Sequence, residues 1–364
     1  MLYGLILAGG RGKRLWPESD ANTPKQFLSR TGGKSLLFET VSRLRSFIPS
    51  ERIFVSTTSK FAFRTKEILN DDRITVISEP VGRNTAPAIA LAALKILQSD
   101  PDAVMAVLPS DHFIDNVDAF RLVLESAAAL LEEDPTRLVT IGIIPHSPAT
   151  EYGYIQAPAP LLSGKSITMF AESLPRRVDL FVEKPDRATA EKFINQGGFY
   201  WNSGIFIWKA ARILDLIGRF LPELAPFVVK NVRYLASASC DLFNAYNSLP
   251  SISIDKAVME KARNIILLPA SFRWSDLGTF ETFSLFDNSN VGFEDNSVLG
   301  ASLFSAEASG NIVRVTLPDG AEPFTVALGG VDHLLIVLKG NTLLVVPQGR
   351  EDLIQRLADQ KDSS

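Results

Sequence analysis

The chain has 364 residues, a formal net charge of −4, one cysteine and three histidines. This length accommodates one large domain and a smaller one, and the weak negative charge gives no reason to expect nucleic acid or an anionic membrane as a partner. A single cysteine excludes an internal disulfide bond and fits a reducing compartment, and no apolar run approaches the roughly 20 residues that span a bilayer. We therefore expect a globular, cytoplasmic protein.

From the N-terminus to about residue 285, short apolar runs typical of strands alternate with helical patterns. The clearest predicted strands are Leu5–Ala8, Ile53–Ser56, Thr75–Ser78, Ala103–Leu108 and Leu138–Ile143. The clearest predicted helices are Leu36–Phe47, Ala86–Leu97 and Ala119–Leu131. This alternation predicts an α/β fold with a Rossmann-like, mainly parallel mixed sheet and helices on both faces. Ligands of such sheets bind beyond the carboxyl ends of strands, so the residues that follow strands are the candidates for function.

The pattern changes after about residue 290. Short β-rich segments separated by turn residues follow one another, and a polar helix is predicted over Glu351–Ala358. The predicted strands are Asn311–Leu317, Phe324–Leu328, His333–Lys339 and Thr342–Val346. We predict two domains, over residues 1–286 and 287–364, of which the second is small and β-rich and begins with a polar linker, Asp287–Asn296.

The first predicted strand leads into a glycine-rich turn, Gly9–Gly12, and basic residues follow it. Glycines at a strand end let backbone N–H groups approach a ligand closely, which suits phosphate oxygens. Arg14 and Lys25 would add the positive charge that neutralises a polyphosphate. The simpler interpretation is a tight turn with solvated cations. We expect a nucleotide to contact the backbone of Leu7, Ala8, Gly9, Gly10 and Gly12.

Two aspartates follow predicted strands that lie far apart in the sequence. Asp111 comes after the fourth strand, and Asp276 comes after the apolar run Ile265–Leu268. Two such carboxylates can converge to complete an oxygen-rich Mg²⁺ site on the phosphates of a nucleotide. Each also has a simpler interpretation: Asp111 as a helix N-cap or turn residue, and Asp276 or Ser275 as the cap of a helix over Phe280–Phe286.

Residues 4–28 resemble the signature of sugar-1-phosphate nucleotidylyltransferases, and specifically of the mannose-1-phosphate guanylyltransferases. Further motifs of that family follow in its order: EPVGRNTAPAI over 79–89, LPSDH over 108–112, EYGY over 151–154, FVEKP over 181–185 and WSDLG over 274–278. The resemblance covers nearly all of residues 1–285, and residues 310–347 look like the tail of the short mannose enzymes. One departure is Lys13, which stands where the family commonly has threonine.

The resemblance implies a fold of the nucleotide-diphospho-sugar transferase type, with residues 1–286 as the catalytic domain. It implies a tail with rungs of a left-handed β-helix, which in this family often contributes to dimer contacts, and hence a homodimer. The implied reaction transfers GMP from GTP to α-D-mannose 1-phosphate and yields GDP-mannose and pyrophosphate by a Mg²⁺-dependent in-line displacement. The expected partners are these two substrates.

The same resemblance assigns roles to particular residues. Arg14 and Lys25 would bind the triphosphate, Lys184 the sugar phosphate, and Asp111 and Asp276 the Mg²⁺ ion. The predicted sugar contacts are Gly153, Glu183 and Asn202. The predicted nucleotide contacts beyond the glycine turn are Glu79, Asn84, Thr85 and Ser110, of which the first three are expected to face the guanine.

Several of these residues also have purely structural interpretations. Glu183 and Lys184 could form a surface ion pair at a strand end, Gly153 could belong to a plain turn, and Thr85 is expected to cap the helix over Ala86–Leu97.

Three other functions remain open from the residues alone. The substrate could be another sugar 1-phosphate, or the chain could be a non-catalytic subunit that binds a sugar nucleotide. A nicotinamide-dependent dehydrogenase is disfavoured because its fingerprint requires a glycine at position 15, where this chain has Leu15.

Overall fold

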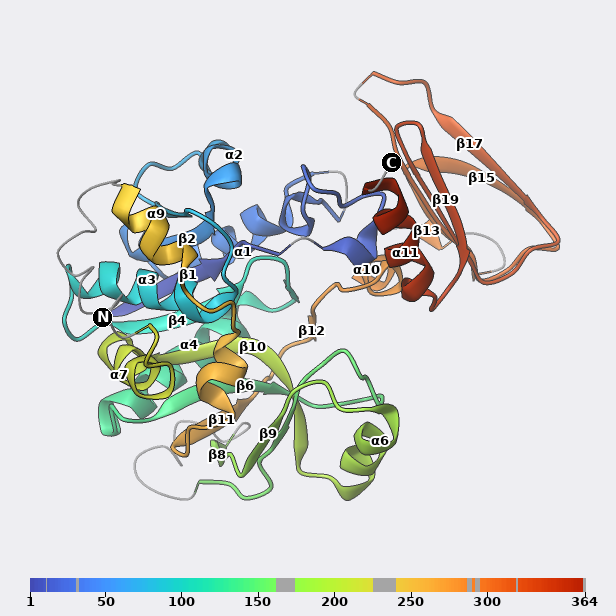
Figure 1. Cartoon of the computed structure of the whole chain (residues 1–364). Coiled ribbons are helices and arrows are strands. Elements are labelled where there is room, and N and C mark those ends of the chain that lie inside the picture. Colours follow the sequence, from blue (N-terminus) through green and yellow to red (C-terminus); the bar gives the residue numbers. More distant parts are fainter. Residues whose placement is uncertain are drawn as a thin grey trace. The chain divides into compact units, whose positions relative to one another are not determined.

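The computed structural model describes residues 1–10, 12–30, 33–161, 174–224, 240–286, 290–291, 295–318 and 320–362 (Figure 1). The chain forms two compact units. Unit 1 comprises Met1–Gly9, Val41–Ser110 and Ile114–Trp274, and unit 2 comprises Gly10–Thr40, Asp111–Phe113 and Ser275–Ser364. Residues 287–289 and 292–294 of the predicted linker lie outside the described residues.

Unit 1 is built on one mixed sheet with the strand order β3-β2-β1-β4-β10-β6-β11-β8. In addition, β7 pairs with β10, and β9 pairs with β7. β1 pairs in parallel with β2 and β4, β2 with β3, and β6 with β11, whereas β10 runs antiparallel to both β4 and β6. The strands are β1 Leu2–Leu7, β2 Ile53–Thr58, β3 Thr75–Glu79, β4 Val104–Pro109, β6 Leu138–Ile143, β7 Tyr154–Gln156, β8 Arg176–Arg177, β9 Leu180–Val182, β10 Phe199–Lys209 and β11 Ile265–Pro269. The predicted Rossmann-like mixed sheet is therefore confirmed.

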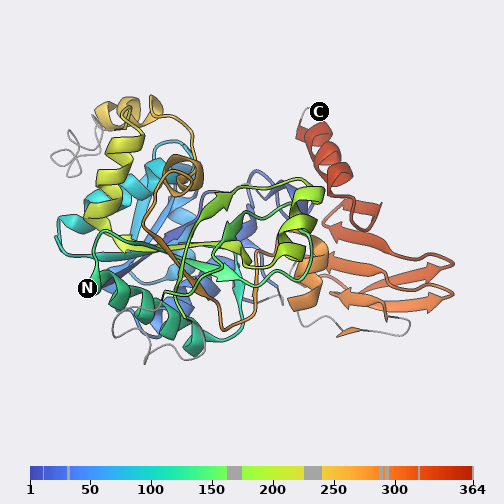
Figure 2. The ribbon, with the colours of Figure 1, turned by 90° about the horizontal axis from the view of Figure 1, so that it is seen from below.

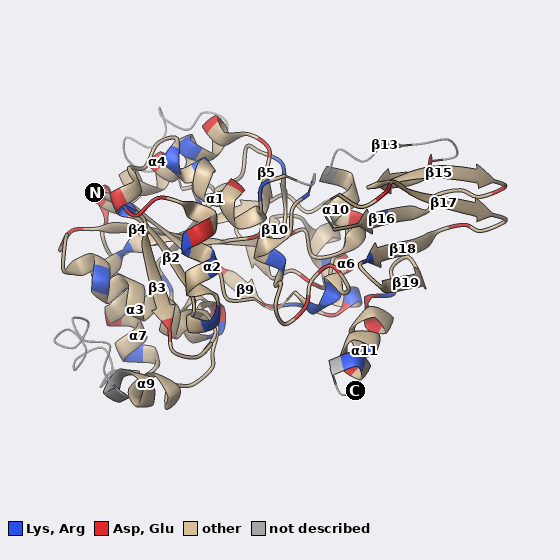
Figure 3. Cartoon of the chain, turned by 90° about the horizontal axis from the view of Figure 1, so that it is seen from above, with Lys and Arg blue, Asp and Glu red and all other residues tan. Residues whose placement is uncertain are grey.

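Helices cover both faces of this sheet, as the alternating pattern predicted. Figure 3 shows α4 on one face and α3 and α7 on the other. The helices with residues in unit 1 are α1 Leu36–Arg45, α2 Ser59–Leu69, α3 Thr85–Leu97, α4 Val117–Glu133, α6 Arg187–Gln196, α7 Ala210–Phe220 and α9 Cys240–Asn247, with the short helices η3 Ser50–Arg52 and η4 Asp255–Met259. Among the described residues, no helix combines the length and the apolar character that crossing a membrane requires.

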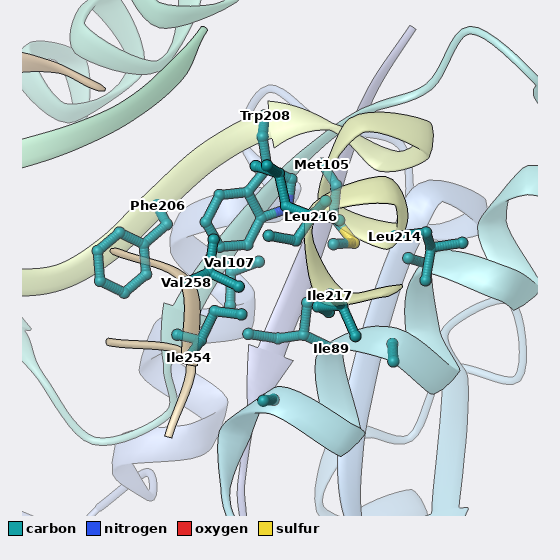
Figure 4. Close-up of a cluster of buried hydrophobic side chains, with 14 of the residues drawn as sticks. Ile89, Met105, Val107, Phe206, Trp208, Leu214, Leu216, Ile217, Ile254 and Val258 are labelled. Atoms are coloured by element: carbon teal, nitrogen blue, oxygen red, sulfur yellow. The ribbon is translucent and has the colours of Figure 1, made fainter. Parts of the chain in front are cut away.

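A large hydrophobic core of unit 1 lies between the sheet and the α3–α7 layer. Side chains of β4 and β10, among them Met105 and Trp208, meet Ile89 of α3 and Leu216 of α7 (Figure 4). The π-helical turn η4 is anchored in the same cluster through buried side chains, including Val258. A turn packed into a core in this way has a fixed position, and so has its first residue, Asp255.

Unit 2 contains a five-stranded sheet with the order β13-β14-β16-β18-β19 and a two-stranded sheet of β15 and β17. The strands are β13 Asn290–Val291, β14 Ser297–Leu299, β15 Ala301–Ala306, β16 Ile312–Thr316, β17 Phe324–Gly329, β18 Leu334–Lys339 and β19 Thr342–Pro347. β14, β16 and β18 are parallel, as are β15 and β17, so successive passes of the chain stack side by side (Figure 2). The predicted β-rich C-terminal region is confirmed.

Two buried asparagines hold the stacked passes together at their turns. The side chain of Asn311 donates to Oδ1 of Asn296 at 2.9 Å and to the carbonyl of Val331 at 2.9 Å, and its own Oδ1 accepts from Leu334 N at 2.9 Å. Asn296 in turn donates to the carbonyl of Ala308 at 2.7 Å. Because buried polar backbone groups need partners, this asparagine ladder fixes the register of the turns.

The remaining elements of unit 2 are short helices and one C-terminal helix. They are η1 Lys13–Leu15, η2 Lys25–Phe27, α10 Phe280–Phe286 and α11 Glu351–Asp362. Two further strands, β5 Phe113–Ile114 and β12 Trp274–Ser275, pair with each other. A buried apolar cluster joins Leu15 of the N-terminal segment to Phe280 of α10 and to Leu335 and Val337 of β18. The N-terminal glycine turn and the C-terminal strands are thus parts of one packed unit.

Candidate active site

The glycines that follow β1 differ in their surroundings. Gly12 precedes η1 with a φ angle of +63°, and a Cβ on it would lie 2.6 Å from the Cβ of Lys25. Gly9 and Gly10 are exposed, and a Cβ on either would meet no atom within 4 Å. The backbone groups of Leu7 and Ala8 are already hydrogen-bonded within unit 1. The carbonyl of Leu7 accepts from Ser110 N at 3.1 Å, and Ala8 N donates to the carbonyl of Ser56 at 2.8 Å.

Lys25 is the centre of the charged part of the site. Its side chain is 9% exposed, and its Nζ lies 2.9 Å from Oδ2 of Asp111 and donates to the main-chain carbonyl of Asp276. Arg14 Nη2 lies 3.8 Å from Oδ2 of the same Asp276. Four predicted site residues from three distant segments of the sequence therefore meet within unit 2.

The environment of Asp111 keeps its carboxylate charged. Burial opposes ionisation, but the Lys25 ammonium and His112 outweigh it, and the pKa of Asp111 is lowered from its ordinary value of 3.8. The carboxylate is thus ionised at neutral pH, which is the form that a divalent cation binds.

The helix-capping interpretations of both aspartates are wrong, although Asp111 does lie in a turn, as its other simple interpretation held. Helix α4 is capped by Asn116, whose Oδ1 accepts from Ala119 N at 2.9 Å. Helix α10 is capped by a reciprocal pair: Thr279 Oγ1 accepts from Thr282 N at 3.2 Å, and Thr282 Oγ1 accepts from Thr279 N at 3.1 Å. Asp276 caps no helix and instead accepts at Oδ1 from Gly278 N at 3.0 Å.

The two aspartates suit Mg²⁺ as a partner of phosphate oxygens. Mg²⁺ is usually held by one or two carboxylates together with water and substrate phosphates. Asp111 and Asp276 supply two carboxylates that are 25% and 16% exposed. Within the described part of the chain, no group of three or more His, Cys, Asp or Glu side chains could hold a metal ion. The two carboxylates fit the number that proteins commonly supply to a magnesium site.

Gly278 is a further site residue that the sequence did not predict. A Cβ on it would lie 2.5 Å from Oδ2 of Asp276 and 3.0 Å from Nη2 of Arg14. A larger residue would push apart the two side chains that the site brings together. The glycine of WSDLG is the signal, because a glycine beside a functional carboxylate often marks a close approach.

The segment predicted to face the guanine is tightly held within unit 1. Glu79 is buried, and its two oxygens accept from Ser56 Oγ and Tyr246 Oη, each at 2.8 Å. Burial raises the pKa of Glu79, although both hydrogen bonds oppose the shift. Thr85 Oγ1 accepts from Ile254 N at 2.8 Å.

The expected cap of α3 is corrected by one residue. The N-cap is Asn84, whose Oδ1 accepts from Thr85 N at 2.8 Å, and not Thr85 itself. The φ and ψ angles of Asn84 are +65° and −168°, a strained combination that a β-branched threonine avoids.

The three predicted sugar contacts converge in unit 1. A Cβ on Gly153 would lie 2.7 Å from Oε2 of Glu183 and 3.3 Å from Cβ of Asn202. Asn202 N also donates to the carbonyl of Gly153 at 2.8 Å. Side chains from the ends of β9 and β10 thus flank a glycine that leaves the space between them open.

Lys184 lies beside this group with an unusual backbone. Its Nζ is 3.5 Å from Oε1 of Glu183, so the ion pair of the simpler interpretation is present. The side chain is nevertheless 62% exposed, and the φ angle is +48°. A lysine in the left-handed region costs about 1–2 kcal/mol, and such strain concentrates at functional sites.

Asp255 completes the group and was not predicted. Its Oδ1 accepts from Asn202 Nδ2 at 3.0 Å. Burial and the nearby Glu183 carboxylate raise the pKa of Asp255 from 3.8 to about 6. Asp255 follows no strand and opens the π-helical turn η4. Its only signal in the sequence is therefore an acid within an apolar stretch.

Comparisons with known proteins show the family to which the chain belongs. The nucleotidyl transferase family matches residues 3–290. A mannose-1-phosphate guanylyltransferase from Klebsiella pneumoniae is 34% identical over 99% of this chain and 74% of its own length. The chain belongs to the mannose-1-phosphate guanylyltransferase family of nucleotidyl transferases. The xanthan biosynthesis protein XanB of Xanthomonas campestris is 35% identical over 98% of this chain and 71% of its own.

A solved structure supports the same membership of the guanylyltransferase family. The protein described as a mannose-1-phosphate geranyltransferase from Thermus thermophilus is 32% identical, with a TM-score of 0.82 over 99% of each chain. The match extends beyond the nucleotidyl transferase region and includes the C-terminal strands.

Lys13, one of the residues at which this chain departs from the guanylyltransferase pattern, has a partner in unit 2. Lys13 Nζ lies 2.6 Å from Oδ1 of Asp359 on α11. Both side chains are largely exposed, so the pair contributes little to stability. It does bring helix α11 to the end of the glycine turn.

Proposed function

We propose that the chain transfers GMP from GTP to α-D-mannose 1-phosphate and releases pyrophosphate. The observation that carries the proposal is the cluster of Lys25, Asp111, Asp276 and Arg14 in a member of this family. The attacking group is a phosphate oxygen of the sugar phosphate, whose second pKa is about 6, so it is largely ionised at neutral pH and needs no general base. Catalysis then depends on positioning and charge neutralisation.

The cationic side chains have distinct tasks in this proposal. Arg14 and Lys25 neutralise the triphosphate, with the exposed backbone of Gly9 and Gly10 as further donors. Lys184 neutralises the sugar phosphate, for which its side chain is sufficiently exposed. With the two anions screened, the sugar phosphate oxygen can approach the α-phosphorus in line with the leaving pyrophosphate.

Asp111 and Asp276 would hold Mg²⁺ together with phosphate oxygens. When bound, the ion would neutralise charge that develops on the phosphates. Lys25 joins the two segments through the carboxylate of Asp111 and the main-chain carbonyl of Asp276.

The group around Gly153 would recognise the sugar. Glu183, Asn202 and Asp255 offer acceptors and a donor to adjacent hydroxyls, and Gly153 keeps the space free. We propose that the guanine is read along the segment of Glu79, Asn84 and Thr85. Since Glu79 and Thr85 already bind protein groups, they would act mainly by holding that segment in place.

We also propose that the chain works in the cytoplasm as a homodimer. The single cysteine suits a reducing compartment, and the β-rich tail resembles tails that contribute to dimer contacts.

The test is pyrophosphate release from the purified protein with Mg²⁺. GTP, ATP, UTP and dTTP would each be combined with mannose 1-phosphate or glucose 1-phosphate. Release confined largely to GTP with mannose 1-phosphate would support the proposal. Release with another pair would overturn the substrate assignment, and no release from folded protein would favour a binding subunit.

A further inference from the structure

A buried ion pair joins the phosphate-binding segment to the C-terminal sheet within unit 2. Glu18 lies between Arg14 and Lys25 in the sequence, and its Oε1 is 3.1 Å from Nε of Arg314 on β16. The two side chains are 7% and 2% exposed. Thr316 Oγ1 donates to the same oxygen at 3.4 Å. The acid is thus enclosed by residues of a strand that lies far from it in the sequence.

A second strand holds the backbone at the same residue. Lys339 Nζ of β18 donates to the main-chain carbonyl of Glu18 at 2.7 Å. The guanidinium of Arg314 also lies over the ring of Phe283, 5.3 Å from its centroid. Both the side chain and the backbone of Glu18 are therefore fixed by the C-terminal part of the chain.

Hydrogen bonds of the next residue connect Glu18 to the residues around Arg14. Ser19 follows it directly, and Ser19 Oγ donates to the carbonyl of Gly12 while Ser19 N donates to the carbonyl of Leu15 at 2.9 Å. These two carbonyls lie on either side of Arg14 in the sequence. Gly12 in turn packs closely on Lys25, so the same contacts determine where both cations lie.

Regular local structure does little to fix this segment. Its two helices, η1 and η2, are single 3-10 turns of three residues each. Such short turns are marginal without tertiary contacts. A buried ion pair is poor evidence for stability, because desolvation offsets the attraction, but it can select one arrangement of the groups that it joins.

We propose that Arg314 is a positioning residue for nucleotidyl transfer. Through Glu18 it fixes the segment that presents Arg14 and Lys25 to the triphosphate, so the C-terminal sheet takes part in catalysis. This inference rests on the function proposed above. Because a displacement near 1 Å can cost about a hundredfold in rate, loss of the Glu18–Arg314 ion pair should reduce activity even where the fold survives.

The test compares Arg314→Met with the conservative Arg314→Lys and with a control, Arg350→Met. Arg350 pairs with Asp352 in the same unit, but it is 48% exposed and lies outside the site. For Arg314→Met we expect kcat/KM for GTP to fall about 10- to 100-fold, with the KM for mannose 1-phosphate within about twofold of wild type. Arg314→Lys should recover part of the loss, and Arg350→Met should show none.

Hydrogen exchange gives a readout that does not depend on activity. Amides of residues 12–28 should exchange faster in Arg314→Met, while amides of the unit 1 sheet stay as in wild type. If Arg314→Met fails to fold, the double variant Glu18→Leu/Arg314→Met removes both buried charges together and should keep the fold with the same loss.

The outcomes separate this inference from the proposed function. An inactive wild type would refute the proposed function. Hydrogen exchange of the amides of residues 12–28 would still show whether the Glu18–Arg314 ion pair fixes this segment. Folded Arg314→Met with unchanged kinetics for GTP and unchanged exchange would overturn the inference. So would a loss of activity that affects both substrates equally and follows only a lowered melting temperature.

Discussion

Replacing Gly153 by alanine adds a single methyl group where the three proposed sugar contacts meet. The new Cβ would lie 2.7 Å from Oε2 of Glu183 and 3.3 Å from Cβ of Asn202. The φ angle of Gly153 lies outside the left-handed region, so alanine fits the backbone. The perturbation is therefore confined to the space between the side chains.

The size of the effect follows from these distances. Ordinary van der Waals contact begins at 3.4 Å, so the Glu183 carboxylate must retreat by about 0.7 Å. The carboxylate is the far end of a flexible side chain, and we expect the melting temperature to change by less than about 2 °C. Since misplacement by about 1 Å can cost a hundredfold in rate, kcat/KM for mannose 1-phosphate should fall about 10- to 100-fold.

The assay is the initial rate of pyrophosphate release with one substrate varied and the other saturating. The KM for GTP should stay within about twofold of wild type, because the two nearest side chains to the methyl group are both proposed sugar contacts. The matched control is Gly218→Ala in α7, where a Cβ meets no atom within 4 Å. A wild-type kcat/KM for mannose 1-phosphate, or an equal loss for both substrates, would refute the assignment of this group to the sugar.

Three other changes test the rest of the site. Lys25→Met should lower kcat about 10²- to 10³-fold by removing a donor to the triphosphate, in a variant whose circular dichroism still shows a folded chain; wild-type turnover would contradict its role. Asp276→Asn should raise the Mg²⁺ concentration for half-maximal rate about tenfold or more, and an unchanged metal titration would exclude it as a ligand. The pKa of Asp255 is about 6 in the folded chain against an ordinary 3.8, so the folded chain holds this proton more tightly than the unfolded chain. Between those two pH values the free energy of unfolding should fall as pH rises, and Asp255→Asn should remove that part of the fall in denaturant titrations. An identical pH dependence in wild type and variant would show that Asp255 is not perturbed.

Much of this protein could be predicted from local patterns. Buried strands are continuous apolar runs, and this property of the sequence located β1, β4 and β6 to within a few residues. Parallel strands place the residues after them at one edge of a sheet, which directed attention to Gly9 and Asp111. Backbone chemistry is equally local, because a glycine at Gly12 permits the positive φ angle that the turn requires.

Only the tertiary structure decided which side chains meet. Asp255 lies in a π-helical turn that no periodic pattern marks, and its proximity to Asn202 results from how that turn packs into the core. Asn84 caps α3 instead of Thr85, because the helix begins at Thr85, one residue earlier than the apolar pattern indicates.

The ion pair between Glu18 and Arg314 is the clearest case of a contact that the sequence alone left undetermined. Both residues were visible as charges, and nothing in their neighbourhoods paired one with the other across 296 positions. Local propensity and periodicity report on neighbours along the chain, whereas this contact forms because two distant segments share one apolar core and exclude water from the pair. The chemistry of the glycine turn was determined by its own residues, and the support that holds it in place was determined by the fold.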